Sequence, residues 1–268
     1  MKLTALNRQQ LTLPGIVFTA LALVGYVWFY HFQPFSDFVN QLALNIITVL
    51  CALVCAIILT LISTFYERGE PSRTIWINFS FALWMWTIGE VIWAIYNMTV
   101  GDVPIVSLAD GFFMLGYVFF TIAITTQFRL VMFDKSKKTI WIAVGVWMLA
   151  ILLTLAILIL TRSQSFSEEF LTYFYPVGDL AIGVSSVILV ITFHRGLLSR
   201  LWLGLFVFAL SDGLYAWAII SGVYVYEPPA GNLITLIIDL TYILAYLAVA
   251  WGAFEQYLML RFGVELSK

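Results

Sequence analysis

Eight long apolar runs, separated by short polar segments, limit most strongly what this chain can fold into. The runs fall at about 15–33, 40–66, 74–98, 109–133, 139–161, 172–194, 199–223 and 232–257. A helix needs about 20 apolar residues to cross the hydrocarbon core of a bilayer, and each run meets that length. The segments between them are polar or rich in turn-forming residues, as at Glu227 to Gly231. The sequence therefore predicts an all-α integral membrane protein with eight transmembrane helices.

The composition agrees with a chain that meets lipid over most of its length. Only 10% of the 268 residues are charged and the mean hydropathy is +0.99, whereas soluble chains carry about 25% charged residues. We expect residues 1–268 to form a single transmembrane domain, with little chain left for a soluble catalytic domain. The net charge of −2 gives no basic field for nucleic acid. Cys51 and Cys55 lie four apart in one apolar run and are expected to be buried packing residues.

The lysines and arginines indicate how the chain is oriented, because positively charged loops stay on the cytoplasmic side. If the N-terminus is cytoplasmic, only Arg162 of the 13 Lys and Arg residues falls on the outer side. We therefore predict a multi-pass protein of the cell membrane with both termini in the cytoplasm. A miscount of one helix would scramble this alternation, so the pattern also favours eight spans.

Two pairs of similar segments predict an internal repeat. Gly89 to Ala94 resembles Ser211 to Ala216, and Asp110 to Tyr117 resembles Asp239 to Tyr246. The matches keep acidic and aromatic positions and occur in the same order, four helices apart. A shift of four helices preserves direction through the membrane, so the sequence predicts two parallel four-helix repeats, at about 1–134 and 135–268. Chance similarity between aromatic-rich helices is the alternative.

Five carboxylates lie within or at the edge of the apolar runs. An acidic residue at bilayer depth costs about 2.5–3.5 kcal/mol on insertion scales, and such residues usually face the interior of a helix bundle. Aromatic residues three or four positions away share their helix faces. We predict that the acids and these rings line one outward-opening cavity that binds a small ligand or cation; the predicted ligand-binding residues are Glu90, Trp93, Asp110, Tyr117, Asp179, Asp212, Tyr215, Asp239, Tyr242 and Tyr246.

The charge state of these acids leaves two interpretations open. No Lys or Arg lies at their depth, so the carboxyl groups are protonated, hydrogen-bonded to polar side chains, or paired with a bound cation. In the structural interpretation they are helix-to-helix hydrogen bonds that hold the bundle together, each contributing about 0.6 kcal/mol. The rings beside them suit a cation or an amphipathic organic ligand, although core packing is the commoner role of an aromatic stripe. We expect the remaining aromatic residues Trp28, Tyr30, Trp76, Trp141 and Trp202 to lie at the membrane interfaces.

Several kinds of chemistry are not expected. Every lysine is terminal or in a predicted cytoplasmic loop, so no span offers a Schiff-base lysine for retinal. His31 and His194 lie at opposite surfaces, which argues against paired-histidine haem ligation. Phosphate-binding loops, serine hydrolase motifs and zinc motifs are absent from the sequence. We therefore predict no enzymatic activity, no catalytic residue, no metal site and no cofactor.

One part of the chain resembles a known group of signalling proteins. The resemblance is carried by Gly89 to Tyr96, Gly101, Pro104, Ser107 to Asp110, Phe113, Leu115 and Tyr117. This acidic-aromatic helix, short Gly/Pro loop and Ser-x-Ala-Asp helix start resemble the membrane-embedded sensory domain found before GGDEF, EAL or histidine-kinase output domains in bacteria. Glu90, Ser107 and Asp110 are the matching positions. Only Gln256 to Lys268 follow the last predicted helix, so the resemblance implies that a signal passes to a partner, unless the sequence is cut.

Three functions follow from these features. The first is a sensory or regulatory membrane module that binds a small ligand from outside and signals to a protein partner on the cytoplasmic side. The second is a small ion-coupled transporter, because repeats and intramembrane carboxylates are also transporter features. The third is an accessory subunit of a larger membrane complex. The predicted helices at 74–98, 109–133, 199–223 and 232–257 contain no proline in their central parts, which counts against a transporter with broken helices.

Overall fold

A computed structural model describes residues 8–101, 103–104, 106–132, 166–194, 196–225 and 231–263. This part of the chain is helical and without strands. Its elements are α1 (Arg8–Val27), the π-helical turn η1 (Trp28–Phe32), α2 (Asp37–Ser63), α3 (Pro71–Val100), α4 (Leu108–Met132), α6 (Phe166–Phe193), α7 (Leu197–Ile220) and α8 (Leu233–Phe262). Within the described ranges, seven helical spans are long and apolar enough to cross a membrane. The prediction of an all-helical, multi-pass membrane protein is confirmed, and the predicted run at 139–161 lies outside the described residues.

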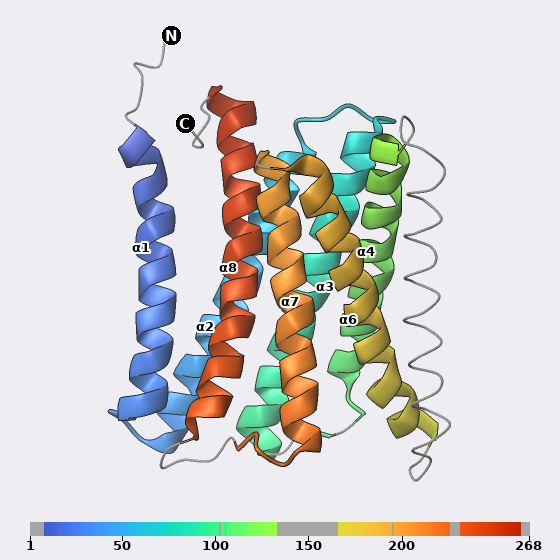
Figure 1. The fold of residues 1–268 in the computed structure, drawn as a ribbon. Helices are drawn as coiled ribbons and strands as arrows, with labels where there is room; N and C mark the ends of the chain where they lie inside the picture. Colours follow the sequence, from blue (N-terminus) through green and yellow to red (C-terminus); the bar gives the residue numbers. More distant parts are fainter. Residues whose placement is uncertain are drawn as a thin grey trace.

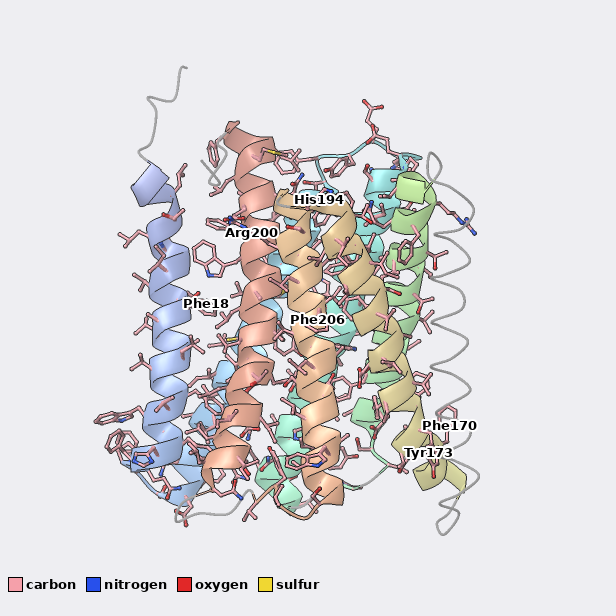
Figure 2. The ribbon with its side chains drawn as sticks, viewed as in Figure 1. Phe18, Phe170, Tyr173, His194, Arg200 and Phe206 are labelled. Carbon is pink, nitrogen blue, oxygen red and sulfur yellow. The ribbon has the colours of Figure 1, made fainter. Side chains whose placement is uncertain are left out.

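The helices run up and down through one bundle (Figure 1). Arg8 at the start of α1 and Phe262 at the end of α8 lie at the same end of the bundle, which we name the terminal end; the opposite end is the distal end. The arginines that the structure describes lie at the terminal end or within the first or last turns next to it: Arg8, Arg68, Arg73, Arg129, Arg200 and Arg261. Figure 2 labels Arg200 and His194 there, and Phe170 and Tyr173 near the distal end.

Six of the helices form a closed ring. Going round it, α2 packs against α3, α3 against α4, α4 against α6, α6 against α7, α7 against α8, and α8 back against α2. Helix α1 lies outside this ring, beside α2 and α8. Buried residues make up only 11% of the most apolar stretch of α1, compared with 56% of that of α3. The ring therefore holds the core, and α1 is a peripheral helix.

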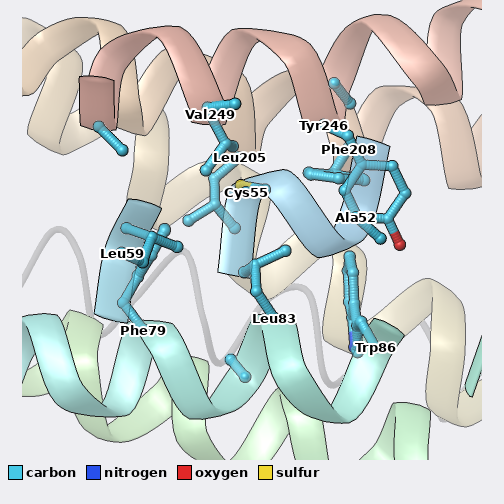
Figure 3. Close-up of a cluster of buried hydrophobic side chains, with 14 of the residues drawn as sticks. Ala52, Cys55, Leu59, Phe79, Leu83, Trp86, Leu205, Phe208, Tyr246 and Val249 are labelled. Carbon is cyan, nitrogen blue, oxygen red and sulfur yellow. The ribbon is translucent and has the colours of Figure 1, made fainter. Parts of the chain in front are cut away.

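Small residues let the helices of the ring approach closely. A Cβ atom on Gly252 of α8 would lie 2.6 Å from the backbone nitrogen of Leu201 in α7, and one on Gly204 of α7 would lie 2.6 Å from that of Val249 in α8. Such contacts are how helices associate in lipid, where the hydrophobic effect does not drive them together. Cys51 and Cys55 are free and buried among apolar neighbours, as predicted (Figure 3).

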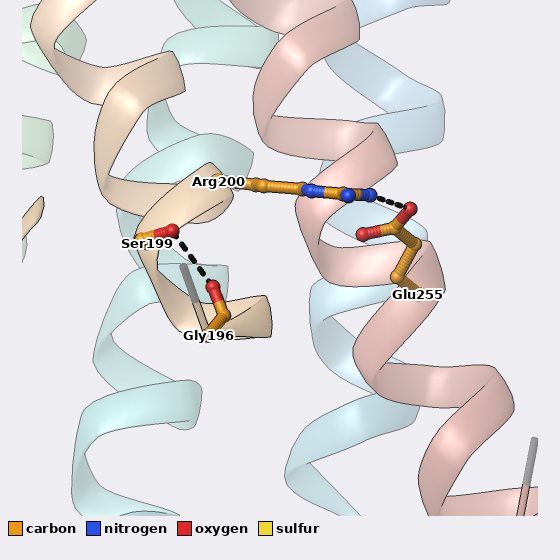
Figure 4. Close-up of polar contacts among 4 residues, drawn as sticks. All are labelled: Gly196, Ser199, Arg200 and Glu255. Atoms are coloured by element: carbon orange, nitrogen blue, oxygen red, sulfur yellow. Dashed lines mark hydrogen bonds and ion pairs between the residues drawn. The ribbon is translucent and has the colours of Figure 1, made fainter. Parts of the chain in front are cut away.

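The helix ends have local causes. Pro71 stands in the first turn of α3, where its missing N–H needs no partner. Gly101 ends α3 with φ of 85°, a conformation that favours glycine. At the terminal end Arg200 of α7 forms an ion pair with Glu255 of α8, and the Ser199 hydroxyl donates to the Gly196 carbonyl (Figure 4). These contacts fix the ends of α3, α7 and α8 around the core.

Three of the aromatic residues predicted at the membrane interfaces lie near helix ends but do not face the surroundings. Tyr30, Trp76 and Trp202 are buried within the bundle. The Trp202 ring meets Phe79 of α3 with centroids 5.6 Å apart, because the α3 and α7 faces that carry these rings both point into the ring of helices. Trp28 is exposed, as an interfacial residue would be, and Trp141 lies outside the described residues.

Candidate functional site

The five predicted carboxylates come from five different helices. Glu90 lies on α3, Asp110 on α4, Asp179 on α6, Asp212 on α7 and Asp239 on α8. Glu90, Asp110 and Asp179 are at most 7% exposed, and the other two are partly buried. Asp110 and Asp239 are in the first two turns of their helices at the distal end, and at 1.5 Å per residue Glu90 and Asp212 lie about 15 Å and about 12 Å from it. All of them except Asp179, near the middle of α6, lie well inside the distal half of the bundle.

Glu90 is held by two tyrosines of α8. Its Oε1 atom accepts hydrogen bonds from the hydroxyl of Tyr242 at 2.6 Å and from that of Tyr246 at 2.9 Å. The two tyrosines lie four residues apart, so both face α3 from one side of α8. The ring of Phe208 in α7 meets both of them edge-on, with centroids 5.6 and 4.5 Å away. Glu90 is therefore a buried carboxylate in an aromatic surrounding.

Asp179 and Asp212 form the second part of the site. The Tyr117 hydroxyl of α4 donates to Oδ1 of Asp179, and Asp212 of α7 is near enough to Asp179 for the two carboxyl groups to interact electrostatically. Two neighbouring carboxyl groups disfavour each other's ionised form. A shared proton or a bound cation would remove that repulsion.

Asp110 and Asp239 mark the distal edge of the site. Asp110 accepts from the Tyr175 hydroxyl of α6 at 2.7 Å. Asp239 accepts from two tyrosines, Tyr26 of α1 at 2.9 Å and Tyr224, just after α7, at 2.8 Å. Each of these hydroxyls comes from a different segment than the acid it serves. Tyrosine hydroxyls from other segments therefore donate to both acids.

Asp212 and Tyr215, one turn apart on α7, connect these parts. Asp212 interacts electrostatically with Glu90 as well as with Asp179. Tyr215 is within electrostatic range of Asp239, Asp212 and Asp110, and its ring packs against Tyr224 with centroids 5.0 Å apart. Ring contacts join the other tyrosines: Tyr117 packs against Tyr175 with centroids 6.0 Å apart, and Trp86 beside Tyr117 meets Phe208, which meets Tyr246. We name these acids and tyrosines the acid-tyrosine network: Glu90, Asp110, Asp179, Asp212, Asp239 and the tyrosines Tyr26, Tyr117, Tyr175, Tyr215, Tyr224, Tyr242 and Tyr246.

No arginine in the described ranges lies inside the acid-tyrosine network, since these arginines gather at the terminal end. Among the same residues, no group of three or more His, Cys, Asp or Glu side chains is arranged to hold a metal ion. The carboxyl groups of the network can accept hydrogen bonds and carry negative charge, and aromatic rings lie beside them. Such a surrounding fits an organic cation, which carboxylates attract and ring faces stabilise by about 0.5–2 kcal/mol.

Nine of the ten predicted residues take part in this network. The tenth, Trp93, is partly buried one turn beyond Glu90. Sequence reasoning missed three tyrosines that donate to the acids. Tyr175 lies four residues before Asp179, and that spacing was a usable signal. Tyr26 and Tyr224 had none, because their partner Asp239 lies on a different helix.

Two groups of rings in the bundle make similar contacts. Trp86 of α3 meets Tyr117 and Phe113 of α4, with centroids 5.6 and 6.5 Å away. Phe208 of α7 meets Tyr246 and Tyr242 of α8 at 4.5 and 5.6 Å. Trp86 and Phe208 meet each other at 5.1 Å. In the sequence alignment of the halves, Phe208 falls opposite Trp86, Tyr246 opposite Tyr117 and Tyr242 opposite Phe113.

Comparison of the chain with models of protein families, with curated proteins and with solved structures found no match. The resemblance to bacterial sensory domains at Glu90, Ser107 and Asp110 stays a prediction. Ser107 and Asp110 have a local role in the fold: the backbone N–H and hydroxyl of Ser107 donate to Oδ2 of Asp110, at 2.6 and 2.8 Å. This is one half of a capping box at the start of α4.

Proposed function

We propose that the protein is a membrane-embedded sensory or regulatory module that binds a small organic cation at the acid-tyrosine network and signals to a protein partner on the cytoplasmic side. One observation carries this proposal. Five carboxylates from five helices meet in one network whose described hydrogen-bond donors are mostly tyrosine hydroxyls. Hydrogen bonds for bundle stability alone would not need five acids at bilayer depth, where each is costly.

The chemistry of the network supports a cation in preference to an anion. Its acids supply negative charge, and Glu90 lies beside Tyr242, Tyr246 and Phe208, whose faces attract positive charge. An ammonium ligand would donate hydrogen bonds to the carboxylates, in place of the tyrosine hydroxyls or in addition to them. A ligand of this kind reaches the network from the distal end, where Asp110 and Asp239 lie.

Thermal melts of the purified protein test this proposal with tetramethylammonium and propylammonium as probes and propionate as the anionic comparison. A ligand present at 100 times its Kd adds about 2.7 kcal/mol of stability, which corresponds to a rise in Tm of about 5–10 °C for a chain of this size. We expect one of the cations, and not propionate, to raise Tm. Equal effects of cations and propionate would refute the proposal.

Two variants place the binding at the network. Asp110→Asn and Asp239→Asn keep the shape of the side chain and remove its charge, so we expect the shift in Tm caused by the cation to shrink while the melt without ligand changes little. Glu67→Gln is the matched control, because Glu67 is an exposed acid in the loop between α2 and α3 at the terminal end. If the control loses the shift as fully as the two Asn variants do, the cation binds elsewhere.

Within this proposal the chain crosses the membrane eight times with the terminal end in the cytoplasm. Two observations support that topology. Helix α4 ends at the terminal end and α6 begins at the distal end, which are the directions that eight spans would give them. The described arginines lie at the terminal end, which is the arrangement of a cytoplasmic face.

We further propose that the two halves are parallel repeats related by a twofold axis along the membrane normal. The ring of helices supports it, because a shift of four helices maps contacting pairs onto contacting pairs. The pair α2 and α3 maps onto α6 and α7, and the pair α4 and α6 maps onto α8 and α2. The matching ring contacts of Trp86 and Phe208 support it as well. Their mutual contact places both beside the proposed axis.

An ion-coupled transporter is the second candidate, and the electrostatic pairing of Asp179 with Asp212 favours it. A carboxyl pair that exchanges one proton for one cation would couple the two movements. Proteoliposomes with an internal pH dye test this directly: an inward tetramethylammonium gradient would make the lumen more alkaline, because each cation that enters is exchanged for a proton that leaves. Asp212→Asn would abolish the change, and an unchanged lumen pH in the wild-type protein would rule this candidate out.

A further inference from the structure

We propose that α1 is the element that moves when the acid-tyrosine network changes state, pivoting at its distal half while its terminal half swings against α8. This inference rests on the proposed function, since it names the helix through which that network would signal. It is carried by three features of α1: where it is buried, how it is attached, and what its attachment touches.

Among the side chains described in α1 and η1, residues 11–32, the buried ones lie on the distal side. Ala22, Tyr26 and Tyr30 are buried, and they fall on one face at four-residue spacing. Nearer the terminal end the same face carries Thr19 and Gly15, which are only partly buried. Phe18 of the terminal half is partly buried against the core, but the fully buried residues among those described lie only in the distal half. A helix that is packed more tightly at one end can pivot there, because fewer buried contacts oppose movement of its other end.

The two halves of α1 are attached by different groups. In the terminal half the indole N–H of Trp251 in α8 donates to the Thr19 hydroxyl at 3.0 Å, and a Cβ atom on Gly15 would lie 3.1 Å from the Trp251 ring. In the distal half the Tyr26 hydroxyl donates to Asp239 at 2.9 Å, and the Tyr30 hydroxyl donates to the Asn232 carbonyl at 3.2 Å. Side-chain hydrogen bonds to α8 and its N-cap therefore attach α1 along its length.

The chain changes its winding at the distal end of α1. The α-helix passes into the π-helical turn η1 and then ends at Gln33, whose φ is 44°. π-helical turns inside or beside α-helices are uncommon and occur often at functional sites. The irregular turn, followed by the short segment before Asp37, is a suitable hinge for α1.

The tether at Tyr26 ends on an acid of the network. Asp239 accepts the Tyr26 and Tyr224 hydroxyls on its two oxygens, one each. A cation that takes up the Asp239 carboxylate competes with these donors, and releasing Tyr26 removes the contact that joins α1 to the network. Because a ligand can shift a conformational equilibrium only through a contact that differs between the states, this hydrogen bond is the coupling element.

Distance measurements between two spin labels test the inference. The labels go on Leu13→Cys in α1 and Leu203→Cys in α7, two exposed positions, in a protein whose buried cysteines are replaced by Cys51→Ala and Cys55→Ala. Leu13 is 13 residues from Tyr26, or about 20 Å along the helix, so a pivot of about 10° moves the label by about 3 Å. We expect Tyr26→Phe to shift or broaden the distance distribution by at least that much. Tyr175→Phe is the matched control, because Tyr175 serves Asp110 on the far side from α1, and it should leave the distribution unchanged.

A second variant keeps the test decisive if Tyr26→Phe does not fold. Thr19→Val removes the acceptor of the Trp251 N–H without touching the network, and it should broaden the same distribution. An unchanged distribution in Tyr26→Phe, or in Thr19→Val where that variant replaces it, overturns the inference even if cations bind. If neither tetramethylammonium nor propylammonium raises Tm, the proposed function is refuted. The distance distributions of Tyr26→Phe and Thr19→Val are measured without ligand, so they test the movement of α1 whatever the result of the melts. In a protein that binds tetramethylammonium, the probe should reproduce the shift seen in Tyr26→Phe.

Discussion

Gly116 on α4 lies where two helices of the ring touch, and replacing it with alanine should destabilise the bundle. A Cβ atom there would overlap two atoms of the Trp86 ring and lie 3.3 Å from the Ala82 carbonyl oxygen. The indole cannot easily give way, because Tyr117, Phe120 and Phe208 surround it within 5.0 to 5.6 Å and its N–H donates to the Phe113 carbonyl at 3.2 Å. Any shift of Trp86 therefore disturbs the centre of the bundle.

The magnitude follows from three terms. Overpacking costs about 1–3 kcal/mol, loss of the indole hydrogen bond about 1 kcal/mol, and alanine returns about 1 kcal/mol of helix propensity. The net loss in the free energy of unfolding is then about 1–3 kcal/mol. Gly213→Ala is the matched control: Gly213 is also inside a helix, but nothing lies within 4 Å of its added Cβ atom, so it should be neutral or stabilising by up to about 1 kcal/mol. Reversible unfolding in mixed micelles measures both, and equal stability of the two variants would refute the packing described at Trp86.

Two further predictions concern the ion pair of Arg200 and the direction of α2 through the membrane. Arg200→Gln should lower the free energy of unfolding by up to about 1 kcal/mol, because Arg200 is half exposed and its pair with buried Glu255 is partly screened; adding Glu255→Gln should cost less than the sum of the two single changes, and full additivity would mean that the pair does not interact. For the topology, Arg68→Cys and Asp37→Cys should react with an impermeant thiol reagent from opposite sides of the membrane, since the loop after α2 and the start of α2 lie at opposite ends. Labelling of both from one side would contradict the bundle.

The lengths and apolar runs of the helices were predictable because a bilayer imposes them. Their ends were harder to predict: the first run was placed at about 15–33, yet α1 begins at Arg8, since hydrogen bonding continues past the apolar residues. The inward direction of the acids was also predictable, as charge is costly against lipid. What the sequence did not specify were contacts between helices, such as Tyr26 with Asp239, because 213 residues separate the partners.

The same limit applies to the aromatic residues. Trp202 lies in the second turn of α7, near the terminal end, and its ring packs inward against Phe79 of α3. Helical spacing identifies which residues share a face. It does not indicate which neighbouring helix that face meets, and for Asp239 the neighbour turned out to include the peripheral α1.

The central claim is that the charge of the buried acids binds a cation, and calorimetry of Glu90→Gln tests it most directly. This substitution keeps a side-chain carbonyl that can accept from Tyr242 and Tyr246 and removes the negative charge. We predict at least about a tenfold loss of affinity for the cation that raises Tm most, equivalent to about 1.4 kcal/mol, with the free energy of unfolding nearly unchanged. Unchanged affinity in Glu90→Gln, or a loss of affinity that follows only from a loss of folding, would contradict the claim and leave the acids as structural hydrogen-bond acceptors.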